Sequence, residues 1–156
     1  MARFNFRLQQ FLGVKEQIEE QKELEYAKAI RKWEEEKALL VKLNADLAQQ
    51  ISDLRNQVMS AIDPLEIKFL NNSIDRLKFH IKHQEERVAA AEAYMDNKRI
   101  ELVEAMKERK ALEIVRDNAH EAFRLEENLA EQKRVDELIS FKQKIKISQD
   151  QIQRSG

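Results

Sequence analysis

The sequence predicts an all-α protein, a long antiparallel two-helix coiled-coil hairpin with a C-terminal helical extension. Charged residues make up 37% of its 156 residues, against roughly a quarter in globular domains, so too little apolar material remains to fill a round core. Only two glycines and one proline are present to punctuate turns. Large apolar residues recur at spacings of three and four, which is the heptad rhythm of a coiled coil. Together these features predict a single elongated coiled-coil domain over residues 1–156.

The first helix is predicted to span about residues 3–60. Its main seam begins at Tyr26, and an earlier run from Phe4 to Ile18 has the same rhythm. The two runs are offset by one residue because Tyr26 follows Ile18 by eight positions, and such a skip predicts a local change in supercoil. The predicted inner positions are Phe4, Leu8, Phe11, Lys15 and Ile18, then Tyr26, Ile30, Trp33, Lys37, Leu40, Asn44, Leu47, Ile51, Leu54 and Val58.

The turn is predicted at about residues 61–64, around the only proline of the chain. Pro64 pushes the residue before it out of the helical region and suits the first position of a new helix. Asp63 can cap that helix, and Glu66 stands where the carboxylate of a capping box reaches back. The first helix therefore ends here and the second begins.

The second helix is predicted to span about residues 64–150. Beyond Phe123 its residues have no partner in the first helix, although Val135, Leu138, Ile145 and Ile152 keep a helical rhythm. A lone amphipathic helix is stable only when its apolar stripe lies on another surface, so this extension must find a partner or fray. The predicted inner positions are Ile67, Leu70, Ile74, Leu77, Ile81, Gln84, Val88, Ala91, Met95, Lys98, Leu102, Ala105, Arg109, Leu112, Arg116, Ala119 and Phe123.

A hairpin folded at Pro64 pairs inner positions whose residue numbers sum to 128. This register sets Asn44 against Gln84, two amides whose mutual hydrogen bonds would penalise slipped registers. Beyond the skip the sum becomes 127, which sets Phe4 against Phe123. The alternative is a structural homodimer unrelated to export, a parallel coiled coil in which Pro64 only kinks a continuous helix.

The sequence offers no catalytic site, and we expect no enzymatic activity, no cofactor and no small-molecule ligand. Glycines do not cluster beside a lysine to form a nucleotide-binding loop. His80 and His83 lie one turn apart but have no third ligand beside them, so we expect no metal site. Acidic and basic residues number 29 and 28, which argues against a nucleic-acid partner. The absence of cysteine fits a reducing compartment.

Two surfaces are candidates for contact with other proteins. An outward stripe near the bend includes two phenylalanines and is either a docking surface or a solvated face. Basic residues gather near the two chain ends, where a solvated charged face is the alternative. The stripe consists of Phe69, Asn72, Arg76, Phe79 and His83, and the basic group of Arg7, Lys15, Arg109, Lys110, Arg116 and Arg124.

Membrane insertion is not expected, because no stretch approaches the roughly 18 uncharged apolar residues of a membrane span. Residues 1–15 could instead form a basic amphipathic helix that lies on a membrane surface. We favour the simpler interpretation, the start of the first coiled-coil helix, because the same face continues past Ile18.

Both ends of the sequence resemble the flagellar FliJ family. The opening run Phe4-Asn5-Phe6-Arg7-Leu8-Gln9-Gln10-Phe11-Leu12, followed by Lys15-Glu16, is similar to the N-terminus of that family. Glu108-Arg109-Lys110-Ala111-Leu112-Glu113, then Glu127, Gln132-Lys133 and Asp136-Glu137, look like its C-terminal block. The resemblance covers the full chain, and the chain length fits as well.

The resemblance implies a cytoplasmic component of the flagellar type III export apparatus, peripherally associated with the inner membrane through that apparatus. It implies an antiparallel coiled coil whose free end contacts a hexameric export ATPase, with further contacts to the export gate and to export chaperones. The outward stripe near the bend is the expected contact with the gate. The expected ring contacts are Arg7, Leu8, Arg109, Lys110, Gln132, Lys133, Asp136 and Glu137.

Overall fold

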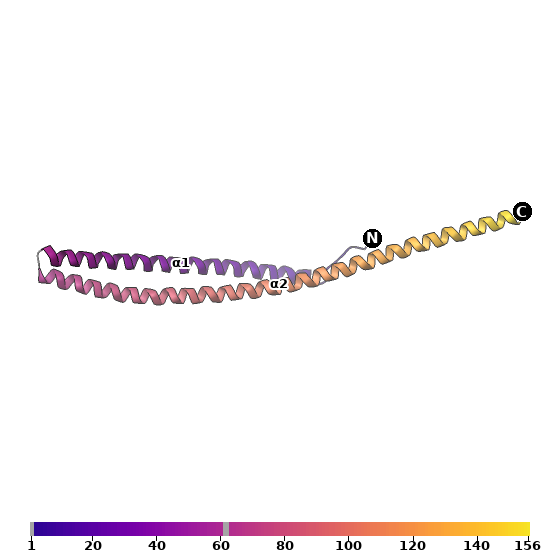
Figure 1. The fold of residues 1–156 in the computed structure, drawn as a ribbon. Helices are drawn as coiled ribbons and strands as arrows, with labels where there is room; N and C mark the ends of the chain where they lie inside the picture. Colours follow the sequence, from indigo (N-terminus) through magenta and orange to yellow (C-terminus); the bar gives the residue numbers. More distant parts are fainter. Residues whose placement is uncertain (1, 61–62) are drawn as a thin grey trace. The chain divides into compact units, whose positions relative to one another are not determined.

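The computed structural model describes residues 2–60 and 63–156. They form two helices, α1 (Gln9–Ser60) and α2 (Pro64–Arg154), and within these ranges there is no strand (Figure 1). The residues divide into two compact units, Lys15–Lys107 and Met1–Val14 with Glu108–Gly156, and each is described by itself. The all-α fold class is confirmed, whereas the single domain over residues 1–156 stays a prediction.

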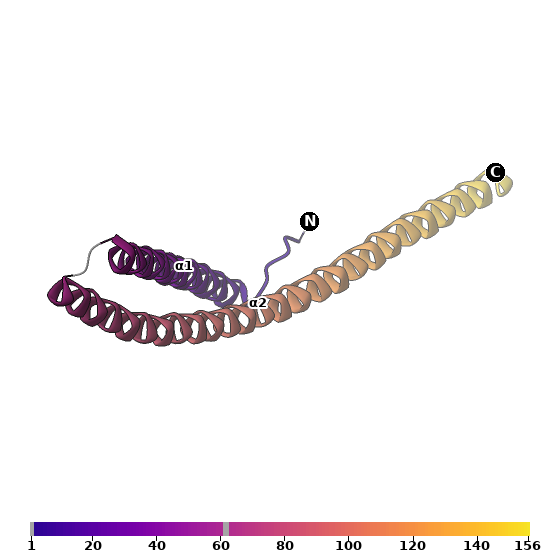
Figure 2. The same ribbon diagram turned by 60° about the vertical axis from the view of Figure 1, so that its left-hand side comes forward.

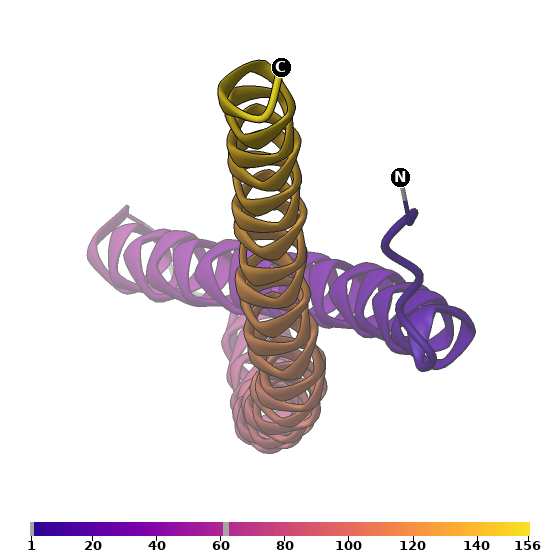
Figure 3. The ribbon, with the colours of Figure 1, turned by 90° about the vertical axis from the view of Figure 1, so that its right-hand side faces the viewer.

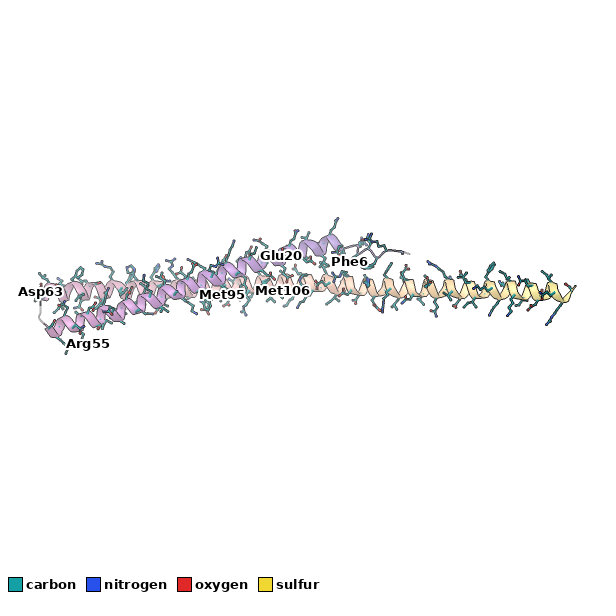
Figure 4. All side chains as sticks on the ribbon, turned by 90° about the horizontal axis from the view of Figure 1, so that it is seen from above. Phe6, Glu20, Arg55, Asp63, Met95 and Met106 are labelled. Atoms are coloured by element: carbon teal, nitrogen blue, oxygen red, sulfur yellow. The ribbon has the colours of Figure 1, made fainter. Side chains whose placement is uncertain are left out.

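In the unit Lys15–Lys107, α1 packs antiparallel against the first part of α2, which confirms the helical hairpin (Figures 1 and 2). The two helices cross at a shallow slope, as helices of a coiled coil do. Figure 4 shows α1 passing over α2 between Arg55 and Glu20, and Figure 3 shows the same crossing from another side. The packing lies within one chain, unlike the parallel homodimer.

The start of α2 follows the predicted chemistry. The Asp63 carboxylate accepts a hydrogen bond from the backbone N–H of Leu65 at 3.1 Å, and its carbonyl accepts one from Ile67 N–H at 3.2 Å. Two amides that a helix start leaves without partners are satisfied in this way. Pro64 is the first helical residue, as predicted. Of the turn predicted at residues 61–64, positions 61 and 62 lie outside the described residues.

The predicted inner face of α2 is confirmed in full. Every predicted position from Ile67 to Phe123 is buried or half-buried, and Ile74, Ile81, Gln84 and Ala105 are buried. α2 ends at Arg154, four residues past the predicted end at 150. An unbroken alternation of three and four over such a length determines one face of a helix without ambiguity.

The inner face of α1 is only half as predicted. Trp33, Leu40, Leu47 and Leu54 are half-buried as expected, but the positions that alternate with them are one residue earlier than predicted. The true inner positions include polar residues, and the displaced apolar residues lie at the edge of the interface. Glu36, Leu43, Gln50 and Gln57 are inside, whereas Lys37, Asn44, Ile51 and Val58 are exposed.

The predicted register, with residue numbers summing to 128, is wrong. Ser73 Oγ donates a hydrogen bond to Gln50 Oε1 at 3.1 Å, and Lys22 Nζ lies 3.3 Å from Glu101 Oε2. The numbers in each of these two pairs sum to 123. The reason is geometric, because α1 ends at Ser60 and α2 begins at Pro64. The chain therefore reverses about residue 62 and not about the proline.

In the unit formed by Met1–Val14 and Glu108–Gly156, the helix begins later than predicted. α1 starts at Gln9, not near residue 3, and Gln9 N–H bonds to the Phe6 carbonyl at 3.1 Å. In the non-helical segment before it, alternate residues point the same way, so Phe4 and Phe6 can both turn inward. Phe6 is buried and Phe4 half-buried. A helix would have placed the two rings on different sides.

The face of α1 near Gln9 is also shifted by one residue. Leu12 has no exposed surface, whereas Phe11 is 52% exposed and Leu8 and Ile18 are exposed as well. The predicted contact of Phe4 with Phe123 is confirmed, since their ring centroids lie 5.5 Å apart. The His120 ring stands edge-on to Phe4 at 4.9 Å. These rings hold the segment before α1 against α2.

Among the described residues, neither helix contains a window that is long and apolar enough to cross a membrane.

Candidate functional site: two surfaces and a polar layer

The outward stripe near the bend is as exposed as the sequence predicts. Phe69 and Phe79 are 72% and 70% exposed, and Asn72, Arg76 and His83 are exposed too. A shallow groove runs beside Phe79 between Lys82, His83 and Glu86. His83 Nδ1 lies 3.9 Å from a Glu86 carboxylate oxygen. Large apolar side chains in water beside charged ones are a usual property of protein-binding surfaces. All five residues belong to the unit Lys15–Lys107.

All eight residues proposed for ring contact fall in the other compact unit. Arg7 and Leu8 form the turn that leads into α1. On α2, Lys110, Gln132, Lys133, Asp136 and Glu137 are exposed. Arg109 differs, because its side chain is only 19% exposed and its Nη1 lies 2.8 Å from Glu113 Oε1. This arginine is held against the helix, so the other seven residues are better placed to meet a partner.

The expected pair of amides, Asn44 with Gln84, does not form. Asn44 is exposed, and the buried Gln84 amide donates hydrogen bonds to the Glu36 carboxylate and, at 3.0 Å, to the Glu36 carbonyl. The Glu36 carboxylate, 6% exposed, also lies 2.8 Å from Lys32 Nζ and 3.2 Å from Arg87 Nη2. Gln84 thus has the predicted register-setting role, but with a charged partner.

A second polar layer joins the helices farther along the same unit. Lys98 Nζ lies 3.4 Å from Glu25 and 3.2 Å from Glu101, and Lys22 Nζ lies 3.3 Å from Glu101. Two lysines and two carboxylates from both helices therefore alternate in one network. The sequence gave no apolar signal for either layer, because Glu36 and Glu25 look like ordinary surface charges. The i and i+4 spacing of Lys32 and Glu36 was the one available hint.

The two layers shift pKa values in directions set by their neighbours. The Lys32 ammonium, followed by the Gln84 amide, holds the pKa of Glu36 below its usual value of 4.5. Hydrogen bonds from Lys98 and then Lys22 lower the pKa of Glu101, and a hydrogen bond from Gln21 is the largest cause of a lowered pKa at Glu25. The Glu101 carboxylate raises the pKa of Lys98.

These shifts predict that acid weakens the hairpin. A carboxylate whose pKa falls on folding stabilises the folded state above its unfolded pKa, near 4.5 for Glu36, and loses that effect as pH falls through its folded value. We expect a lower urea midpoint at about pH 3 than at about pH 7. Glu36→Gln should narrow that difference. Glu104→Gln, at an exposed position, should leave it unchanged. Equal narrowing by both variants would contradict the assignment.

A family model described as flagellar FliJ protein matches residues 4–146. No curated protein and no solved structure matched the chain.

Proposed function

Because this chain belongs to the flagellar FliJ family, we propose that it is a non-catalytic, stalk-like adaptor of the flagellar type III export apparatus. Family membership supports a role in flagellar protein export. The proposal adds the partners: a hexameric export ATPase, the cytoplasmic region of the export gate, and export chaperones. It also places the protein in the cytoplasm, peripherally associated with the inner membrane through the apparatus.

One observation carries the adaptor role. The candidate ring contacts all lie in one compact unit and the candidate gate contacts all lie in the other. α2 runs without interruption from Pro64 to Arg154 and so contributes residues to both units. Two separate surfaces on one chain are what a protein needs in order to bind two partners at once. A helix paired along its length is also a stiffer connection than a flexible linker of the same number of residues.

The ring contact is tested by the turnover of the purified export ATPase with and without this chain. We expect the chain to raise ATP hydrolysis, and the double variant Gln132→Ala with Lys133→Ala to need about tenfold more protein for the same effect. Both side chains are exposed, so the circular dichroism spectrum should not change.

The matched control is Phe79→Ala, an exposed position in the other unit. It should leave ring turnover as in the parent and weaken capture of the cytoplasmic region of the gate. If the parent chain neither binds the ATPase nor alters its turnover, the adaptor role is lost. If Phe79→Ala and the double variant impair both partners alike, the assignment of separate surfaces is wrong.

A further inference from the structure

The C-terminal end of α2 carries an apolar stripe that no other described residue covers. We call it the tail stripe, and its members are 42% to 72% exposed. All residues from 128 to 156 are exposed. The tail stripe consists of Leu138, Phe141, Ile145 and Ile152.

The tail stripe lies on a face of α2 that is used for packing elsewhere in the same unit. Steps of three and four lead from Phe123 through Glu127, Ala130 and Arg134 to Leu138. Phe123 is half-buried and its ring meets Phe4. The face is therefore covered at Phe123, becomes polar for a short stretch, and turns apolar again where no chain segment covers it. The four apolar residues keep the spacing of a coiled-coil seam.

Charge around the tail stripe has one sign. Lys142, Lys144 and Lys146 lie in this segment, and residues 138–149 contain no Asp or Glu. In the heptad set by Leu138 and Ile145, Lys142 and Lys144 occupy the two positions that flank the seam, where a partner helix places its charged residues. In the described part of the chain none of the three lysines forms an ion pair.

From this arrangement we infer that the tail stripe binds an acidic amphipathic helix of another protein. Such a helix would cover the apolar residues and place carboxylates beside Lys142 and Lys144. A second copy of this chain fits less well, because it would bring three more lysines to the same segment. A lipid surface also fits less well. The stripe covers only about 60° of the helix, whereas membrane-surface helices bury a broader face, and Ile139 and Ile147 point elsewhere.

This surface is distinct from the proposed ring contacts. At about 100° per residue, Gln132, Lys133 and Asp136 lie toward the opposite side of α2 from the tail stripe. The inference therefore goes beyond the adaptor function, and the two can fail independently.

The test uses the full chain and a synthetic acidic helix of about four heptads, with Leu at the seam and Glu at the flanking positions. A matched peptide carries Lys in place of Glu. Fluorescence anisotropy at about 0.1 M salt measures the dissociation constants. We expect the acidic peptide to bind at least about tenfold more tightly than the basic one, and Ile145→Asp to weaken it by about tenfold or more.

Ile147→Asp is the matched control, because Ile147 is 57% exposed but points away from the tail stripe. It should bind the acidic peptide like the parent chain. Equal affinities for the two peptides, or equal losses in the two variants, would overturn the proposal. So would binding to vesicles of phosphatidylserine and phosphatidylcholine that depends on Ile145, or a dimer of the chain that Ile145→Asp dissolves.

Discussion

Ile81→Asp is expected to unfold the hairpin of the unit Lys15–Lys107 under conditions in which the parent chain is folded. Ile81 is only 8% exposed, on the inner face of α2 and one turn from the buried Gln84. A carboxylate there would be removed from water without a cation provided for it, at a cost of about 3 to 5 kcal/mol. Small domains are stable by only about 5 to 15 kcal/mol, so most of the stability is lost.

Urea unfolding followed by far-ultraviolet circular dichroism measures this effect. The matched control is Ile100→Asp, the same substitution on the same helix and in the same unit, where the side chain is 61% exposed. Its free energy of unfolding should stay within about 0.5 to 1 kcal/mol of the parent. Similar unfolding curves for the two variants would mean that the inner face of α2 has been misassigned.

Leu12→Ala is expected to release the start of α1 without unfolding the rest of the chain. Leu12 is fully buried in the unit formed by Met1–Val14 and Glu108–Gly156. Shortening a buried leucine to alanine costs about 2 to 5 kcal/mol. Because this cost falls on a local opening reaction, amide hydrogen exchange reports it directly. We expect protection of the amides of residues 9–14 to fall by about thirtyfold or more.

Phe11→Ala is the control, because Phe11 adjoins Leu12 but is half exposed. Protection in this variant should stay close to that of the parent. The comparison also decides between the structure and the sequence pattern, since the pattern places Phe11 inside and Leu12 outside. A larger effect at Phe11 than at Leu12 would favour the pattern and contradict the structure.

The fold class, the turn and the whole inner face of α2 could be predicted from sequence, because each rests on a signal that nothing contradicts. Pro64 and Asp63 mark a helix start by their local chemistry, and the resulting cap is formed. α2 keeps one unbroken seam. The exposure of Phe69 and Phe79 follows directly from that seam, since they lie on its far side.

The inner face of α1 could not be predicted from hydrophobicity, because polar residues occupy some of its inner positions. Glu36 and Gln50 face inward and bond to Gln84 and Ser73, while the apolar Ile51 is 38% exposed at the edge. A pattern that assigns apolar residues to the interior therefore shifts the seam by one residue. Specific polar bonds between the helices determine the register, and the sequence shows their members only as ordinary surface residues.

The ring and gate contacts stay proposals for a different physical reason. Residues that serve a partner are exposed in the free chain, as Lys133 and Phe79 are. Exposure gives them no intramolecular contact by which a structure of one chain could distinguish them from other solvated residues. Only the family resemblance and their grouping into separate compact units single them out.

The reversal of the chain within one molecule is tested most directly by cysteine cross-linking, since the chain has no cysteine of its own. Gln50→Cys with Ser73→Cys places two thiols where the Gln50 and Ser73 side chains meet at 3.1 Å. Oxidation at low protein concentration is expected to give a cross-linked monomer of 18.5 kDa, whereas Asn44→Cys with Gln84→Cys should not close within one chain. A product of twice that mass from the first pair, with no cross-linked monomer, would contradict the hairpin.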